Sequence, residues 1–253
     1  MLPQRRHAEI LQCLARDGSA SIAALCERLS TSPATIRRDL IWLEGEGVLR
    51  RVHGGAVIEV DQMGHERPFA QVAHEQTDAK DVLARAAANL VEDGQTALLD
   101  IGTTAHRVAV HLHGRPVTVL TSNLAVYEEL ADDTAVELIL LGGAVRRNYR
   151  SMVGFLTEDA LRQVRADHVF LGTSGVRGDG SVMDDTVVQV PLKRAMVAAG
   201  DQVVLLADRD KFPGGGLARV CGPGELDIVV TNQGADETTL AALRDADVEV
   251  LLA

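Results

Sequence analysis

Two adjacent arginines, Arg37 and Arg38, stand near the start of a predicted helix and are suited to contact phosphates or the edges of bases. Ser32 can accept a hydrogen bond at the N-terminus of this helix. Pro33 suits the first helical position because its missing N–H needs no partner there. Thr35 lies beside the arginines. A helix that presents this end to the major groove is typical of proteins that bind double-stranded DNA.

A second basic group follows in a segment predicted to form a short hairpin. Arg50, Arg51 and His53 lie on or between two strands predicted at residues 48–52 and 56–60, and two glycines follow the histidine. Such a hairpin is typical of the wing of a winged helix-turn-helix. A salt-bridged surface is the alternative for the arginines of the helix, because acidic residues are close in the sequence. These acids are Asp39, Glu44 and Glu46.

Polar residues and glycines also follow three successive predicted strands, at the point where each strand ends. They are Asp100, Gly102, Thr103 and Thr104 after the first strand, Ser122 and Asn123 after the second, and Gly142, Gly143 and Arg146 after the third. Ligands of open α/β sheets bind outside these carboxyl ends. Glycine permits close approach, and helix N-terminal amides donate to anions. Each group alone is explained as well by a helix cap or turn, but the three together favour a site for a phosphate and sugar hydroxyls.

Lysine is rare in this chain and is therefore informative. Only three of the 25 basic residues are lysines, namely Lys80, Lys193 and Lys211. A lysine kept in an arginine-rich composition can serve where a compact point charge is needed. We expect Lys193, Lys211 and the strand-end residue Asp208 to contribute to the ligand site, with a solvated surface as the alternative for the lysines. Asp208 and Asp210 are more often turn formers than metal ligands, so we predict no metal and no cofactor.

The elements that must position these residues differ between the two parts of the chain. Apolar residues repeat at helical spacing in residues 4–16, in a second helix capped by Ser21, and in residues 33–44. The short connection between the second and third helices suits a helix-turn-helix. Residues 61–78 are polar and weakly patterned, which is typical of a connecting segment.

From about residue 79 helices alternate with apolar strands, which indicates a mostly parallel sheet covered on both faces. The predicted strands are 96–101, 117–121, 136–141, 168–171, 203–207, 228–230 and 248–252, and the predicted helices are 80–91, 105–112, 124–130, 187–199 and 237–246. We therefore predict a winged helix-turn-helix DNA-binding domain in residues 1–58, a linker in residues 59–78 and an α/β effector-sensing domain in residues 79–253.

Composition agrees with this division. The 253 residues carry a net charge of −11, yet residues 1–60 hold eight arginines against seven acids, whereas the remainder holds 17 basic groups against 29 acids. The local basic patch matters for attraction to phosphate. The chain shows no signal-peptide pattern and no apolar run long enough for a membrane span, so we expect a soluble cytoplasmic protein. Its three cysteines lack the spacing of a disulfide framework or zinc site.

The segment TIRRDLIWLEGEGVLRRVHGGA, residues 35–56, closely resembles the N-terminal signature of the DeoR family of bacterial transcription regulators. Further stretches resemble the same family along most of the chain. They are Asp100-Ile101-Gly102-Thr103-Thr104, Thr121-Ser122-Asn123, Leu141-Gly142-Gly143 with Arg146, residues 151–154, Phe170-Leu171-Gly172, Lys193-Arg194-Ala195-Met196, and Asp208 with Lys211-Phe212.

This resemblance implies a repressor of sugar-catabolic genes that a phosphorylated sugar or related metabolite releases from operator DNA. It also implies an α/β domain similar to ribose-5-phosphate isomerase, with the isomerase chemistry lost. The chain departs from the family at Thr173-Ser174-Gly175, where an acid or amide is common, and at Gln189, where a glutamate is common. Isomerisation requires a placed carboxylate base, so we predict no catalytic residue and no enzymatic activity.

Two alternatives stay open at this stage. The protein could be an active sugar-phosphate isomerase fused to a DNA-binding module, or a constitutive DNA-binding protein whose second domain only forms oligomers. For the repressor we expect a homo-oligomer, a dimer or higher, because symmetric recognition helices read half-sites separated by whole helical turns.

Overall fold

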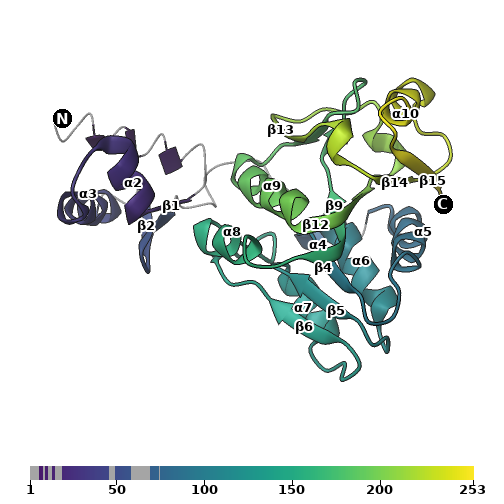
Figure 1. Cartoon of the computed structure of the whole chain (residues 1–253), viewed down its shortest axis with the longest axis horizontal. Helices are drawn as coiled ribbons and strands as arrows, with labels where there is room; N and C mark the ends of the chain where they lie inside the picture. Colours follow the sequence, from purple (N-terminus) through teal and green to yellow (C-terminus); the bar gives the residue numbers. More distant parts are fainter. Residues whose placement is uncertain are drawn as a thin grey trace.

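The computed structural model describes residues 6–7, 9–10, 13–14, 19–45, 49–57, 69–73 and 75–253. Figure 1 shows a small N-terminal part, called the head below, beside a larger part that contains a seven-stranded sheet, called the body. The head comprises the described residues up to 57, and the body comprises those from 69 onward. Among the described residues, no helix is long and apolar enough to span a bilayer.

The head contains two helices and a three-stranded antiparallel sheet. The helices are α2 (Ile22–Leu29) and α3 (Pro33–Gly45), and the strands are β1 (Ser19–Ser21), β2 (Arg50–Val52) and β3 (Gly55–Val57) in the order β1-β3-β2. The described residues of the predicted first helix are helical as well. The head therefore has the helices and the wing that the sequence predicts, together with a strand, β1, that it did not predict.

Local sequence explains where the elements of the head begin. The Ser21 hydroxyl accepts a hydrogen bond from the Ala24 N–H at 3.1 Å and so caps α2. Apolar residues of all three helical stretches and the sheet form one buried cluster. It comprises Ile10, Cys13, Leu14, Ala20, Leu25, Leu29, Ile36, Leu40, Leu43, Leu49 and Ala56. Residues 48 and 58–60 of the predicted wing strands lie outside the described residues.

The main sheet of the body is parallel throughout, as the alternating pattern predicts. Its strands are β4 (Thr96–Leu99), β5 (Thr118–Thr121), β6 (Glu137–Leu140), β9 (Ala166–Gly172), β12 (Gly200–Leu206), β14 (Ile228–Thr231) and β15 (Glu249–Leu252). Their order is β15-β14-β12-β9-β4-β5-β6, with every pair parallel. Chain order reverses between β4 and β9, and open α/β sheets generally bind ligands at such a reversal.

Helices cover both faces of this sheet, because successive strand residues point to opposite faces and nearly all are apolar. Leu99 and Phe170 pack on the face covered by α5 (Thr77–Ala88), α6 (Thr103–Leu112) and α7 (Leu124–Leu130). Leu98 and Val169 pack on the opposite face. That face is covered by α8 (Phe155–Leu161), α9 (Val190–Ala199) and α10 (Glu237–Arg244).

Short elements absent from the sequence predictions complete the body. They are the hairpin β7 (Ala144–Arg146) and β8 (Ser151–Val153), the sheet of β10 (Gly175–Val176), β11 (Val182–Asp184) and β13 (Ala218–Cys221), helix α8, and the 3₁₀ turns η3 (Arg209–Lys211) and η4 (Pro223–Glu225). The predicted helix 187–199 begins as a 3₁₀ turn, η2 (Val187–Gln189), and continues as α9. Strands of two to four residues are too short to give a visible period in the sequence.

The segment predicted as a linker is partly helical. Helix α4 (Phe69–Ala73) lies within it, and α5 begins at Thr77 rather than at residue 80. The Phe69 N–H donates to the Asn148 carbonyl at 2.9 Å, and the Phe69 ring lies edge-on to the rings of His106 and Tyr149. Residues 69–73 are thus packed against the body. Residues 59–68 of the predicted linker lie outside the described residues.

Candidate nucleic-acid interface and sensor site

Helix α3 presents its two arginines to solvent at its N-terminal half. The Ser32 hydroxyl accepts a hydrogen bond from the Thr35 N–H at 3.3 Å and lies 3.0 Å from the Thr35 hydroxyl. Ile36, Leu40 and Leu43 of α3 face the core of the head, and Arg37 and Arg38 are exposed on the other side. The sequence prediction for the start of this helix therefore agrees with the structure.

Two of the three acids close to these arginines in the sequence, Asp39 and Glu44, are bound by other groups, and Glu46 lies outside the described residues. Asp39 is buried and accepts hydrogen bonds from Arg6 at 2.5 and 2.9 Å. His7 Nε2 lies 2.9 Å from the same carboxylate. Burial opposes ionisation of Asp39, but these hydrogen bonds outweigh it and lower its pKa. The charge of Asp39 is therefore satisfied within the head.

Glu44 is held by the wing. It accepts the Arg51 backbone N–H at 2.8 Å and the Arg51 guanidinium at 2.7 Å, and these bonds lower the pKa of Glu44. Within the described part of the chain, Arg37, Arg38 and Arg50 form no ion pair. The salt-bridged alternative therefore applies to Arg51 and not to the arginine pair of α3.

The wing tip is a tight turn at which the side chain of His53 is exposed. Gly54 has a φ of +81°, a conformation that favours glycine, between strands β2 and β3. His53 and Arg50 are exposed. The one tryptophan of the chain, Trp42, stacks on His7 with ring centroids 4.6 Å apart. It therefore packs against the first helical stretch.

In the body, Asp100 occupies the point where the chain order of the sheet reverses. It follows β4, and its Oδ2 accepts the N–H of Gly172, at the end of neighbouring β9, at 2.8 Å. The Lys193 amine donates to the same oxygen at 2.5 Å and to the Gly172 carbonyl at 2.8 Å. A second carboxylate, Asp184, lies 3.4 Å from the amine. The predicted residues Asp100 and Lys193 are thus in direct contact.

Lys193 is buried beneath the strand ends rather than at their rim, with 2% of its surface exposed. Burial favours the neutral amine, but attraction to Asp100 and Asp184 outweighs this effect and raises the pKa of Lys193. The amine therefore stays charged and binds the ends of β4, β9 and β11 together. Neighbouring Gln189 is also buried.

Asn123, after the second predicted strand, is hydrogen-bonded to the loop that follows the first. The Asn123 side-chain amide donates to the carbonyls of Asp100 at 3.3 Å and Gly102 at 3.1 Å, and its oxygen caps α7. Gly102 has a φ of +136° and begins α6, whose first residue, Thr103, is buried. Thr104 is half-buried, and Ser122 is buried. The loop at Gly102 is therefore held in a fixed shape with the glycine accessible from solvent.

The residues after the third predicted strand, Gly142, Gly143 and Arg146, have different surroundings. Arg146 is buried, and its guanidinium lies 5.4 Å from the centre of the Tyr149 ring. The Tyr149 hydroxyl faces Gly102, and burial raises the pKa of Tyr149. Gly143 is required by packing, because a Cβ there would collide with Thr157 and Val153. Gly142 has open space beside its Cα, and its carbonyl accepts the Thr157 hydroxyl.

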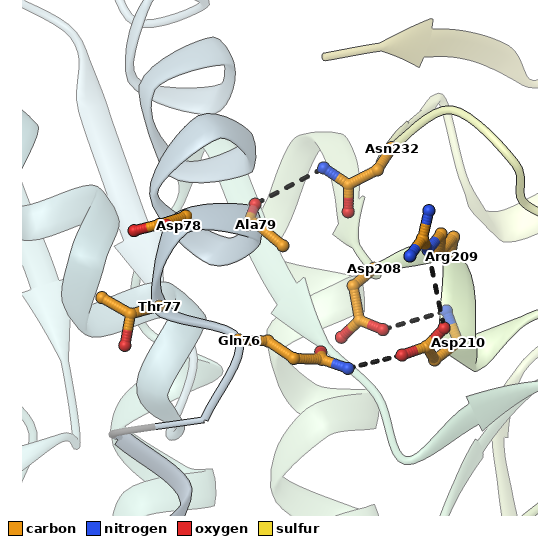
Figure 2. Close-up of a pocket in the computed structure, with 8 residues that line it drawn as sticks. All are labelled: Gln76, Thr77, Asp78, Ala79, Asp208, Arg209, Asp210 and Asn232. Carbon is orange, nitrogen blue, oxygen red and sulfur yellow. Dashed lines mark hydrogen bonds and ion pairs between the residues drawn. The ribbon is translucent and has the colours of Figure 1, made fainter.

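Asp208 lies at a separate opening of the same sheet edge. It follows β12, which is two strands from β4, a separation of about 10 Å. A cavity of about 420 Å³ opens beside it, and Figure 2 shows its lining. The lining residues are Gln76, Thr77, Asp78, Ala79, Asp208, Arg209, Asp210 and Asn232.

The polar groups of this cavity include carboxylates, one guanidinium and neutral amides. Asp208 accepts the Asp210 N–H at 3.0 Å and caps η3, which is the turn-forming role expected of it. Gln76 donates to Asp210 at 2.5 Å. Buried Lys80 lies close enough to Asp208 and Lys211 for both to affect its pKa, which burial lowers overall. Asp208 and Lys211 therefore form a second group with Lys80, beside the Asp100 and Lys193 group.

Two residues of this site carried no signal in the sequence. Asp184 ends the three-residue strand β11, and Tyr149 lies in the turn between β7 and β8. Both elements are too short for their period to be recognised. An aspartate of this kind would be found only once the antiparallel sheet beside α9 is known.

Head and body meet at β1 and the start of α8. The Ser19 hydroxyl accepts the Phe155 N–H at 2.7 Å. Two glycines leave room for side chains at this contact: a Cβ at Gly55 would lie 2.8 Å from Phe155 Cε1, and a Cβ at Gly154 would lie 3.0 Å from Ser19 Oγ. Figure 1 shows α8 on the side of the body that faces the head. This contact connects the head with the start of α8 and with β8, the strand that precedes it.

Both parts match known families. A model described as the DeoR-like helix-turn-helix domain matches residues 6–62, and a model described as the DeoR C terminal sensor domain matches residues 75–233. The chain is 34% identical over 256 residues to the HTH-type transcriptional regulator YgbI of Escherichia coli, covering 100% of this chain and 99% of that protein. It is 31% identical to the glycerol-3-phosphate regulon repressor of the same organism, with 100% of both chains covered.

Among solved structures, the body is similar to ribose 5-phosphate isomerase A from Methanocaldococcus jannaschii. The TM-score is 0.41 at 16% identity, and the match covers 54% of this chain and 55% of that one.

Proposed function

This chain belongs to the DeoR family of transcriptional regulators, and we propose that it is a repressor that a phosphorylated sugar or related metabolite releases from its operator. It acts in the cytoplasm, where its operator DNA lies. The observation that carries the DNA-binding half is the pairing of Asp39 and Glu44 with other groups, which leaves Arg37 and Arg38 exposed. In the proposed complex these side chains contact bases or phosphates, together with Ser32, Thr35 and the wing residues Arg50, Arg51 and His53.

The proposed effector site is the carboxyl edge of the parallel sheet. An anion there meets the accessible Gly102, the N-terminus of α6 and the cation Arg146. Lys211 lies in the second group with Lys80 and Asp208, beside the cavity. The hydroxyls of a sugar meet the polar groups of the cavity beside Asp208. Lys193 does not contact the effector but holds the strand ends in place, because its amine is already bound by Asp100 and Asp184. This edge thus offers a glycine loop and a cation to a phosphate group, and the carboxylates and amides of the cavity to hydroxyl groups, which suits a phosphorylated polyol.

We propose that β8 transmits the presence of the effector to the head. The Met152 N–H donates to the Ser122 carbonyl at 2.8 Å, so β8 is bonded to the loop after β5. Two and three residues after Met152 the chain reaches Gly154 and Phe155, which contact Ser19. A ligand that moves the loop therefore moves the support of β1. Coupling of this kind requires different effector affinities in the free and DNA-bound states.

The experiment is a titration of the operator complex with a panel of metabolites. Glycerol 3-phosphate, pentose 5-phosphates and hexose 6-phosphates would be added to the full-length protein bound to fluorescent DNA from its own promoter, with the unphosphorylated parents as controls. We expect one phosphorylated compound to lower DNA affinity and Lys211→Ala to weaken this response. If no compound changes the affinity and Lys211→Ala has no effect, the effector assignment is wrong.

The same samples test for turnover. Buried Gln189 and the segment Thr173-Ser174-Gly175 supply no carboxylate, and Asp100 and Asp184 are both within reach of the Lys193 amine. We therefore propose binding without isomerisation. Interconversion of any sugar phosphate during the titration would establish the isomerase alternative instead. Light scattering would test the proposed homo-oligomer, which we expect to be a dimer or higher.

A further inference from the structure

The middle of the exposed face of α3 is apolar. A helix advances by roughly 100° per residue, which places Ile41 roughly 40° from Arg37 and 60° from Arg38 around the axis. Ala34 lies on nearly the same line as Ile41. The side facing the core carries Leu40, which is 1% exposed, whereas Ile41 is 52% exposed. Ile41 therefore stands between the two arginines on the surface turned away from the head.

Packing within the head does not account for this isoleucine. It lies outside the buried cluster of the head. The neighbouring exposed residue, Trp42, is accounted for by its stacking on His7. A β-branched side chain on an exposed helix face also contributes nothing to helix propensity. Ile41 thus differs from the other large apolar residues of α3, each of which has a contact within the head.

The two arginines define what covers Ile41. If they contact the bases and phosphates of a major groove, the side chain between them is pressed against base edges. The apolar group that the major groove offers there is the C5 methyl of thymine, which cytosine and the purines lack. Loss of water from both surfaces favours this contact. We propose that Ile41 reads a thymine in each operator half-site through its methyl group, a role that rests on the proposed DNA binding.

The test removes the C5 methyl group of thymine and leaves the hydrogen-bonding groups of the base unchanged. Binding sites for the full-length protein would be selected from a random DNA library, and each thymine of the best site would then be replaced by uracil, which lacks only the methyl. We expect one position per half-site at which uracil weakens wild-type binding about fourfold, the equivalent of one buried methyl-sized group. In Ile41→Ala this position would show equal affinity for thymine and uracil, whereas Ile41→Leu would retain a preference.

Val82→Ala provides the matched control, because Val82 is a half-exposed aliphatic residue on a helix of the body. It should leave the thymine preference unchanged. The proposal is overturned if uracil has the same effect on the wild type and Ile41→Ala at every position, or if Ile41→Ala changes only the oligomeric state. If the wild type selects no site at all, DNA binding itself fails, and that result is distinct from failure of the Ile41 contact.

Discussion

Head and body use positive charge in opposite ways. In the head, buried or wing-bound acids leave Arg37 and Arg38 exposed to a polyanion. In the body, Lys193 is 2% exposed and is surrounded by Asp100 and Asp184. An exposed cation contributes to binding and is screened by salt, whereas a buried ion pair mainly fixes the geometry around it. The comparison teaches that the surroundings of a basic residue decide its use, more than its presence in the sequence.

The largest expected effect comes from breaking the buried cluster in the body. Lys193→Met leaves two carboxylates buried without their cation, and we expect the free energy of unfolding to fall by about 3–5 kcal/mol. Urea denaturation of the full chain measures this loss. The matched control is Arg85→Met, which removes an exposed partner of Asp81 and should cost about 1 kcal/mol or less. Equal effects of the two variants would mean that the burial of Lys193 does not distinguish it.

The next effect concerns the exposed pair in the head. Arg38→Ala should reduce the preference for operator over unrelated DNA by about 5- to 150-fold, the range of a lost bidentate contact to guanine. Fluorescence anisotropy with both DNAs would measure it. Arg162→Ala, at an exposed arginine of the body, serves as the control. An equal loss on both DNAs would identify Arg38 as a phosphate contact instead.

A smaller effect separates the two arginines of the wing. Arg50 forms no ion pair among the described residues, whereas Arg51 is bound to Glu44 at 2.7 Å. Arg50→Ala should therefore reduce the slope of log affinity against log salt by about 0.9, the value of one phosphate contact. Arg51→Ala should change the slope less. A larger change in slope for Arg51→Ala than for Arg50→Ala would show that Arg51 contacts phosphate despite its ion pair with Glu44.

The smallest effect is on the pH dependence of the stability of the body. Hydrogen bonds to Glu129 and then Asp133 raise the pKa of His113 above its ordinary value of 6.5. A raised pKa stabilises the fold fully below the unfolded value, and this contribution is lost as pH rises through the folded value. His113→Gln should thus be less stable than the wild type below pH 6.5, and thermal unfolding should show the difference disappear at higher pH. A difference that stays constant with pH would contradict this assignment.

Long, regular elements could be predicted from the sequence, because burial on both faces gives the strands continuous apolar runs. Helix α7 has the predicted bounds, and β4 and β5 agree to within two residues. The strand β1 could not be predicted, because it has three residues and gains its partners only from β3. The same holds for β7, β8 and β11, whose pairing partners are also short or distant in sequence.

The candidate site was predictable only in part for the same reason. Asp100 and Lys193 were found separately, from a strand end and from the rarity of lysine, and the structure joins them across 93 positions. Their separation from Asp208 could not be predicted, because strand order is not visible in the sequence. The pairing of Glu44 with Arg51 could not be predicted either, because by its position in the sequence Glu44 could equally pair with Arg37 or Arg38.

The most direct test of the account is reciprocal measurement of the two affinities. The Kd of the full-length protein for the active sugar phosphate would be measured by calorimetry with and without saturating operator DNA, and the Kd for the operator with and without saturating sugar phosphate. Linkage requires the two ratios to be equal, and the account predicts a factor of about 5 or more in both. An effector Kd that is the same with and without operator would contradict it.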